Sequence, residues 1–338
     1  MKINEGRVKQ SAKNMISGFL YQTVTLILSF ISRTVFINTL GTEYLGLNGI
    51  FTDVLSLLSM ADLGFGTAMA YSFYKPLAEH DEDRIAALIH FYKKVYHIIA
   101  VTVTVLGLLC VPFLKYIVNT QEEIPNLTWY YLFSLANIVI SYLFVYKTTL
   151  MTADQKDYKI VNIRMWATLT KTILQILALY LTANYMLYII IGVLAQFLTN
   201  AIASWQTQKE YPYIRNADTQ TRVEKEVEQG IFNNMKSVFI YKLSGTLFSA
   251  TDNLLISSFV GVVTAGIYSN YYLIIGSVRQ VLDQAMLGVA ASVGNLGVTE
   301  EKEKVGQIFD RLFFIGYWLF GFAGICLLEL LNPFVELA

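Results

Sequence analysis

The chain has few of the residues that soluble enzymes use for chemistry. It contains two cysteines and three histidines in 338 residues. Cys110 and Cys326 both lie in apolar stretches, which indicates small buried side chains rather than a disulfide or redox pair. The histidines, His80, His90 and His97, lack the spacing of metal ligands. Since phosphate-binding loops, dinucleotide-binding glycine motifs and nucleophile elbows are also absent, we expect no catalytic residues, no metal, no cofactor and no enzyme activity.

Charge is scarce as well, and hydrophobic residues are abundant. Only 15% of the residues are charged, whereas 55% are hydrophobic and occur in long runs separated by short polar segments. This composition excludes a soluble globular domain and is typical of an integral membrane protein. The formal net charge is zero, which by itself says nothing about a nucleic-acid partner. For an integral membrane protein of this kind we expect no such partner.

Nine stretches are long enough to span a bilayer, which requires about 20 apolar residues in a helix. They predict an all-α, multi-pass helical bundle. The predicted spans are Met15 to Leu40, Tyr44 to Phe73, Val95 to Val118, Leu127 to Met151, Ile163 to Leu181, Tyr185 to Trp205, Val238 to Val260, Thr264 to Ala291 and Ile308 to Leu331. The first two are expected to form a hairpin with a tight turn around Gly41 to Gly46.

Basic residues are distributed unequally between the two sets of connections. Twenty of the 25 Lys and Arg residues lie at the N-terminus or in the second, fourth, sixth and eighth connections, whereas the alternate connections hold only Lys115. Basic residues concentrate on the cytoplasmic side of membrane proteins. The pattern therefore predicts a cytoplasmic N-terminus, with very short loops outside the membrane.

An internal repeat appears when the sequence is offset by 220 residues. Asn14 to Tyr21 then matches Asn234 to Tyr241 at five of eight positions, and Gly41 and Gly46 align with Gly261 and Gly266. The repeat predicts an N-terminal six-helix bundle, residues 1–233, followed by the first three helices of a second bundle, residues 234–338. An even number of helices makes the two repeats parallel. A complete second repeat would need three more helices, so we expect the chain to be a fragment.

Several ionisable or polar residues lie inside the predicted spans, where an ionised side chain costs about 2.5 to 3.5 kcal/mol on insertion scales. They are Arg33, Asp53, Asp62, Asp252, Asn253, Arg279 and Asp283, with Lys171 and Lys242 nearer the cytoplasmic mouth. One interpretation is a set of static ion pairs, for example between Arg33 and Asp53. The other, which we favour because polar residues recur in matching helices of both repeats, is the lining of a substrate cavity.

Two segments resemble a known family of transporters. Met60-Ala61-Asp62-Leu63-Gly64-Phe65-Gly66-Thr67-Ala68 is similar to a signature of the polysaccharide transporter family of lipid-linked oligosaccharide flippases. Thr251-Asp252-Asn253-Leu254-Leu255-Ile256, with Gly261 and Ala265-Gly266-Ile267-Tyr268-Ser269, is similar to another part of it. This family shares a superfamily with the multidrug and toxin extrusion exporters and the lipid II flippase. Its members commonly have 12 to 14 helices, whereas nine are predicted here.

The resemblance implies a V-shaped transporter that works by alternating access around a central cavity. Its implied substrate is an undecaprenyl-diphosphate-linked oligosaccharide, moved across the bacterial cytoplasmic membrane for surface polysaccharide biosynthesis. Arg33 and Arg279 would meet the diphosphate, and the carboxylates would hydrogen-bond sugar hydroxyls. Implied partners are this substrate, membrane lipids, and polysaccharide polymerase or export proteins. Two alternatives remain: a cation-coupled multidrug exporter of the same superfamily, whose carboxylates would bind protons or sodium, and a membrane glycosyltransferase or polymerase.

Overall fold

The computed structural model describes residues 5–59, 65–118, 124–215, 223, 229–231, 251–299 and 302–337. Every element in these ranges is a helix, which confirms the predicted all-α class. The chain divides into two compact units, Met1–Ala265 and Gly266–Ala338. The predicted boundary between residues 233 and 234 lies outside the described residues, and the predicted division into two bundles stays a prediction.

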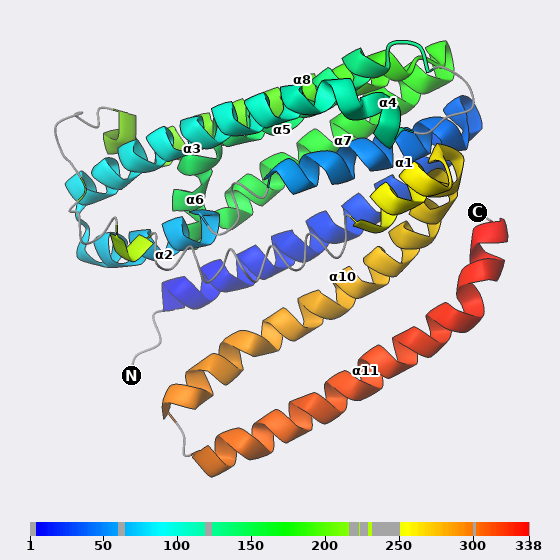
Figure 1. Ribbon diagram of the computed structural model, residues 1–338. Helices are drawn as coiled ribbons and strands as arrows, with labels where there is room; N and C mark the ends of the chain where they lie inside the picture. The colour runs from blue at the N-terminus through cyan, green and yellow to red at the C-terminus, as the bar shows by residue number, and fades with distance from the viewer. Residues whose placement is uncertain are drawn as a thin grey trace. The chain divides into compact units, whose positions relative to one another are not determined.

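Unit 1 contains most of the helices (Figure 1). They are α1 (Glu5–Leu58), α2 (Phe65–Glu79), α3 (Glu82–Cys110), the 3-10 turn η2 (Val111–Phe113), α4 (Leu114–Ile117), α5 (Leu127–Tyr142), α6 (Val145–Ala153), α7 (Asp157–Thr182), α8 (Tyr185–Glu210), the 3-10 turn η3 (Pro212–Arg215) and the helical segment 251–259. Helix α10 (Val262–Thr299) begins in unit 1 and continues into unit 2, which also contains α11 (Lys302–Leu337).

Helix α1 is two helices joined by a sharp turn at Gly41. This glycine has φ 83° and ψ 174°, a conformation that is essentially restricted to glycine. The apolar part of α1, Lys13–Leu58, has 46 residues and would be about 69 Å long as one straight helix, more than twice the thickness of a bilayer core. The two halves instead run in opposite directions (Figure 1). The predicted hairpin is therefore present, and its turn is at the first of the predicted turn glycines.

The core of unit 1 is built from helices far apart in the sequence. Helix α1 packs against α7, α7 against α8, α8 against α5, and α5 against α3. At the α3–α5 contact, Gly107 lets the two helices approach closely, because a Cβ atom added there would lie 2.5 Å from Leu135 Cδ1. The hydroxyl of Tyr131 donates a hydrogen bond of 3.0 Å to the Gly107 carbonyl. Both Tyr131 and Leu135 are buried, so this contact fixes the spacing of the two helices.

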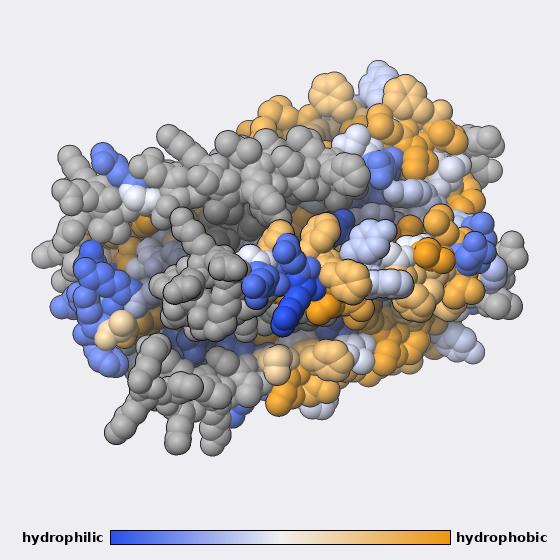
Figure 2. Space-filling model, turned by 90° about the horizontal axis from the view of Figure 1, so that it is seen from below, coloured by the Kyte–Doolittle hydropathy of each residue, from blue (hydrophilic) through white to orange (hydrophobic). Residues whose placement is uncertain are grey.

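Many large apolar side chains are exposed, as expected for a surface in contact with lipid. Figure 2 shows broad hydrophobic areas on the face toward the viewer. In the described part of the chain, four helices are long and apolar enough to cross a membrane, or five if the bent pair α5–α6 forms one span. The four are Lys13–Leu58, Glu82–Ile117, Tyr185–Glu210 and Phe309–Val335. The bent pair consists of α5 and α6, which meet at an angle of 47°. The chain is a multi-pass membrane protein.

Some predicted boundaries differ from the structure. The second predicted span, Tyr44 to Phe73, is covered by two helices, since α1 ends at Leu58 and α2 begins at Phe65. The third begins earlier than predicted, because the Asp81 side chain caps α3 by accepting a 2.9 Å hydrogen bond from the Arg84 N–H. Apolar periodicity alone misses such a polar first turn.

Candidate functional site

The predicted site residue Asp53 lies beside two others, Asp252 and Asn253. Asp53 is in the second half of α1, and its carboxylate accepts a hydrogen bond from the Asn253 side chain, with Asp252 close enough to repel it. Asn253 is only 7% exposed. Asp53 Oδ2 and Asn253 Oδ1 are buried and have no hydrogen-bond partner among the described residues. A buried unsatisfied acceptor costs about 1 to 3 kcal/mol, so these two oxygens favour a ligand that donates hydrogen bonds.

The helical segment 251–259 is held against unit 1 by a side chain that the sequence did not single out. The hydroxyl of Ser257, which is fully buried, donates a 2.7 Å hydrogen bond to the carbonyl of Ile117 at the end of α4. Gly261 follows the segment, with φ 132° and its N–H donating to the Ile256 carbonyl at 3.0 Å. These contacts set the position of Asn253 relative to Asp53.

Arg33 has different neighbours from Asp53. It lies near Tyr188 at the start of α8, and Tyr188 also hydrogen-bonds Ser32, the residue before Arg33. Tyr188 belongs to an aromatic cluster that joins α1, α5 and α8. Its members are Phe36, Tyr44, Tyr130, Tyr185 and Tyr188, with ring centroids of contacting pairs 4.8 to 6.2 Å apart. The structure therefore places Arg33 beside aromatic rings and Asp53 beside an amide.

Two other predicted site residues, Arg279 and Asp283, belong to unit 2. In unit 2, Arg279 and Asp283 form the four-residue pair that their spacing predicts, with Nε and Oδ2 3.6 Å apart. Both side chains are exposed. Asp62 and Lys242 lie outside the described residues, so their predicted roles stay predictions.

Lys171 lines a polar cavity of about 120 Å³ between α1, α7 and α8. Arg164, which the sequence placed in a cytoplasmic connection, is the second cation of this cavity. Gln196 and Asn200 line it from α8, and Tyr21 from α1. The missed signal was helical spacing: Arg164 and Lys171 are seven residues apart, and Gln196 and Asn200 are four apart, so each pair lies on one helix face.

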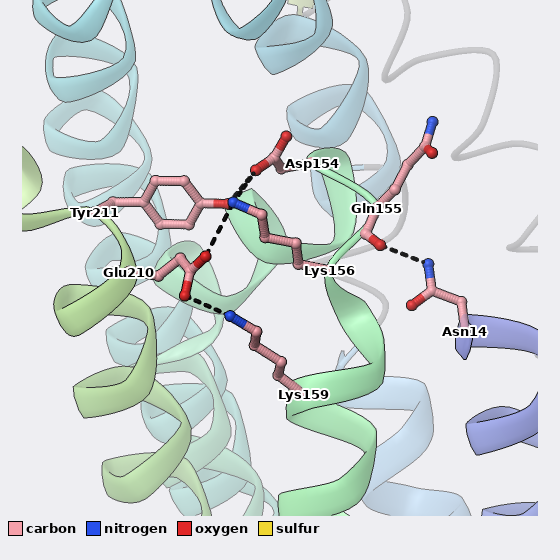
Figure 3. A network of polar contacts seen from close by, with 7 residues as sticks. All are labelled: Asn14, Asp154, Gln155, Lys156, Lys159, Glu210 and Tyr211. Carbon is pink, nitrogen blue, oxygen red and sulfur yellow. Dashed lines mark hydrogen bonds and ion pairs between the residues drawn. The ribbon is translucent and has the colours of Figure 1, made fainter. Parts of the chain in front are cut away.

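A second feature that the sequence did not predict is a network of ion pairs between the α6–α7 connection and the end of α8 (Figure 3). The ammonium of Lys156 lies 2.8 Å from Asp154 Oδ2 and 3.0 Å from Glu210 Oε1. Lys159 also pairs with Glu210, and the Tyr211 hydroxyl donates a 2.6 Å hydrogen bond to Asp154. Glu210 and Tyr211 lie more than 50 residues after the other three groups in the sequence, so only the fold brings them together.

The electrostatics of the network keep Lys156 charged. Burial lowers the pKa of Lys156, but hydrogen bonds and attraction to Asp154 and Glu210 outweigh burial, so the net pKa is raised. Burial, with the nearby charge of Asp154, raises the pKa of the Tyr211 hydroxyl far above its usual range. The hydrogen bond from Lys159 lowers the pKa of Glu210, so at neutral pH the network contains a charged Lys156, an ionised Glu210 and a neutral Tyr211.

Asn14 ties the start of α1 to the same connection. Its amide nitrogen donates a 2.8 Å hydrogen bond to the Gln155 carbonyl (Figure 3). Its amide oxygen accepts one of 2.8 Å from the Tyr158 N–H. The ammonium of Lys13 lies 5.1 Å from the centre of the Tyr158 ring. Among the described residues, no group of three or more His, Cys, Asp or Glu side chains is arranged to hold a metal ion.

Two solved structures resemble this chain in fold. An inward-facing multidrug resistance transporter of the MATE family, in the MOP superfamily, is 14% identical, with 92% of this chain and 71% of that chain covered and a TM-score of 0.60. A chain described as "protein A" is also 14% identical, with coverages of 98% and 75% and a TM-score of 0.59. The fold is therefore similar to that of this MATE-family transporter.

No curated protein matches the sequence. The model of a family described as "Polysaccharide biosynthesis protein" matches residues 11–290, which is most of the chain. The sequence resemblance to a polysaccharide family is thereby confirmed. The chain belongs to the polysaccharide biosynthesis protein family.

Proposed function

We propose that the chain is a membrane transporter that moves an undecaprenyl-diphosphate-linked oligosaccharide from the cytoplasmic to the outer leaflet of the bacterial cytoplasmic membrane, by alternating access. The observation that carries this proposal is the combination of a transporter fold with membership of a polysaccharide biosynthesis family. A family that makes glycans needs a step that carries them across the membrane. In this orientation the N-terminus is cytoplasmic.

The chemistry of the polar residues supports the proposal. A glycan and its diphosphate cannot cross about 30 Å of hydrocarbon unaided, so they need a polar surface inside the membrane. Asp53 and Asn253 offer buried acceptor oxygens for sugar hydroxyls. Arg33 offers a guanidinium whose fork suits phosphate oxygens. Arg279 is assigned the same role in unit 2, while Asp62, Asp252 and Asp283 are proposed as further cavity residues and Lys171 and Lys242 as cations of the cytoplasmic mouth.

A translocation assay tests this function directly. The full-length protein is reconstituted in liposomes with a fluorescent undecaprenyl-diphosphate-linked oligosaccharide, and an impermeant reductant bleaches the label in the outer leaflet. Protein-free liposomes should lose about half of the fluorescence, whereas liposomes containing the protein should lose nearly all of it. Bleaching that stops at half with correctly reconstituted protein would exclude flippase activity on this substrate.

A cation-coupled multidrug exporter is the second candidate. It is favoured by the fold likeness to a MATE-family transporter and by the proximity of two carboxylates, Asp53 and Asp252. Efflux of ethidium from cells that produce the protein distinguishes the two functions. An exporter predicts efflux that collapses when Asp53 is replaced by Asn, whereas a flippase predicts no efflux above cells with an empty vector.

A further inference from the structure

An apolar groove lies along α7 and α8, next to the polar cavity around Lys171. The groove has a volume of about 560 Å³ and is lined by apolar side chains such as Trp166, Leu174 and Leu198, which are 66%, 49% and 57% exposed. Among the residues that the structure describes, no acidic side chain lines either the groove or the polar cavity. Neither cavity shares a lining residue with the Asp53–Asn253 site.

The two cavities meet at the same side chains. Ala167, Lys171, Ala195 and Thr199 line both of them. The two alanines leave space at the junction, and Lys171 lies at the boundary between polar and apolar surroundings. A single molecule with a polar end and an apolar chain would therefore fit both cavities at once, with its polar end beside Lys171.

The charged side chains that line the polar cavity indicate which kind of headgroup would bind there. Arg164 and Lys171 lie two turns apart on one face of α7, about 10 Å along the helix axis. Gln196 lines the cavity from α8, and the Asn200 amide nitrogen there is buried without a hydrogen-bond partner among the described residues. Two cations and amide donors, without a carboxylate, suit phosphate oxygens. They disfavour a zwitterionic headgroup, whose ammonium would find no counter-charge.

We propose that the polar cavity and the groove form one lateral site for a single-chain lipid with a diphosphate headgroup: the headgroup binds between Arg164 and Lys171, and the chain lies between α7 and α8. Two cations match a diphosphate better than the single negative charge of most anionic phospholipids, and one groove accommodates one chain. The inference rests on the proposed function, because the carrier of a lipid-linked oligosaccharide has this chemistry. It adds a second place where unit 1 holds the lipid, away from Asp53.

Photo-crosslinking tests the site in the full-length protein. The probe is geranylgeranyl diphosphate with a photoreactive group near the end of its chain, and labelled peptides are identified by mass spectrometry. Labelling should fall within residues 163–174 and 191–202. Excess unlabelled geranylgeranyl diphosphate should compete, whereas equal concentrations of pyrophosphate, geranylgeraniol or phosphatidylglycerol should compete much less. Full competition by phosphatidylglycerol would identify a general lipid contact, and full competition by pyrophosphate an anion pocket without a chain; either result overturns the proposal.

Variants test the two cations. In R164Q/K171Q the loss of two charge-assisted contacts should reduce labelling by about tenfold or more at subsaturating probe. The matched control K75Q/K94Q removes two exposed cations elsewhere in unit 1 and should leave labelling unchanged. R164Q alone, at an exposed position, keeps the test valid if the double variant does not fold. Unchanged labelling in a folded R164Q/K171Q variant would overturn the site.

The translocation assay separates this proposal from the proposed function. If the wild-type protein translocates the lipid-linked oligosaccharide but labelling is absent from α7 and α8, the lateral site is wrong and the function stands. If labelling is as expected but translocation is absent, the lateral site stands and the function is wrong.

Discussion

Arg33 and Asp53 are the intramembrane charges that test the proposed mechanism most directly. Both belong to α1, on opposite sides of the turn at Gly41. Arg33 has Tyr188 as a neighbour, and Asp53 has Asn253 and Asp252. If Arg33 binds the substrate diphosphate, its role does not depend on Asp53.

We expect the double variant Arg33→Ala with Asp53→Ala to export surface polysaccharide as poorly as Arg33→Ala alone. Removing the guanidinium removes the counter-charge of the diphosphate, and a loss of about tenfold or more is expected for such a contact. Arg33→Lys should retain partial export, since it keeps a point charge without the fork. The measurement is complementation of an export-deficient strain at matched membrane abundance.

Near-normal export by the double variant would contradict this prediction. It would show that the two charges only balance each other, because removing both partners of a structural pair avoids leaving one buried charge unpaired. The phosphate-binding role would then pass to Arg279.

Lys156 should contribute more to stability than an exposed lysine does. Its side chain is 24% exposed and contacts two carboxylates. Replacing it with Met leaves Asp154 and Glu210 without this cation, so we expect the free energy of unfolding to fall by about 1 to 3 kcal/mol. Lys94→Met, at an exposed position in α3, should change it by less than about 0.5 kcal/mol. Thermal unfolding in detergent measures both.

The pH dependence of this contribution follows from the raised pKa of Lys156. A cation with a raised pKa in the folded state stabilises the protein fully below its unfolded pKa of about 10.4, and the stabilisation is lost as the pH rises through the folded value. The difference between wild type and Lys156→Met should thus be constant from pH 7 to about pH 9. A difference that disappears in that interval would show that Lys156 does not act through its charge.

At the scale of helices, the turn at Gly41 determines how α1 folds back on itself. An added Cβ at Gly41 would meet no atom within 4 Å, so space does not forbid a side chain there. The backbone conformation of Gly41 disfavours a side chain, because a residue other than glycine at a φ of 83° costs about 1 to 3 kcal/mol. Gly41→Ala should therefore lower the free energy of unfolding by that amount.

Gly18→Ala provides a matched control for Gly41→Ala. Gly18 is also in α1 and also has no atom within 4 Å of an added Cβ, but it has ordinary helical geometry. Alanine is favoured over glycine inside a helix by about 0.5 to 1 kcal/mol, so this change should leave stability unchanged or raise it. Equal melting temperatures for the two variants would mean that the Gly41 conformation carries no strain for alanine.

At the scale of the whole molecule, the distribution of basic residues predicts the orientation in the membrane. We expect a cysteine at Ala183, in the turn between α7 and α8, to react with an impermeant thiol reagent added outside intact cells. A cysteine at Asp83, in the first turn of α3, should react only after the membrane is permeabilised. The background carries Cys110→Ser and Cys326→Ser. The opposite labelling pattern would reverse the orientation and the direction of transport.

One structural observation bears on the predicted duplication. Gly41 and Gly261 are aligned by the 220-residue offset, and they are the two glycines with positive φ among the described residues. Both lie between two helical segments. This agreement supports two copies of one hairpin, although the duplication itself stays a prediction.

The class of the molecule, most of the described helices and the α1 hairpin followed from the sequence alone. Their signals are local: an apolar run of about 20 residues predicts a span, and a glycine between two such runs predicts a turn. The Arg279–Asp283 pair was predictable for the same reason, since residues four apart meet on one helix face. The polysaccharide family was also predictable, because its motifs are short and contiguous.

Only the tertiary structure decided which distant residues meet. The contact of Asp53 with Asn253 spans the two predicted repeats, and the network of Asp154, Lys156 and Glu210 joins a loop to the end of another helix. Arg164 was assigned to a loop from composition, yet the packing of α1, α7 and α8 places it at a cavity with Lys171. Local patterns indicate which segments form helices and where α1 turns, whereas the partners of a buried charge depend on how complete helices pack, which no local pattern contains.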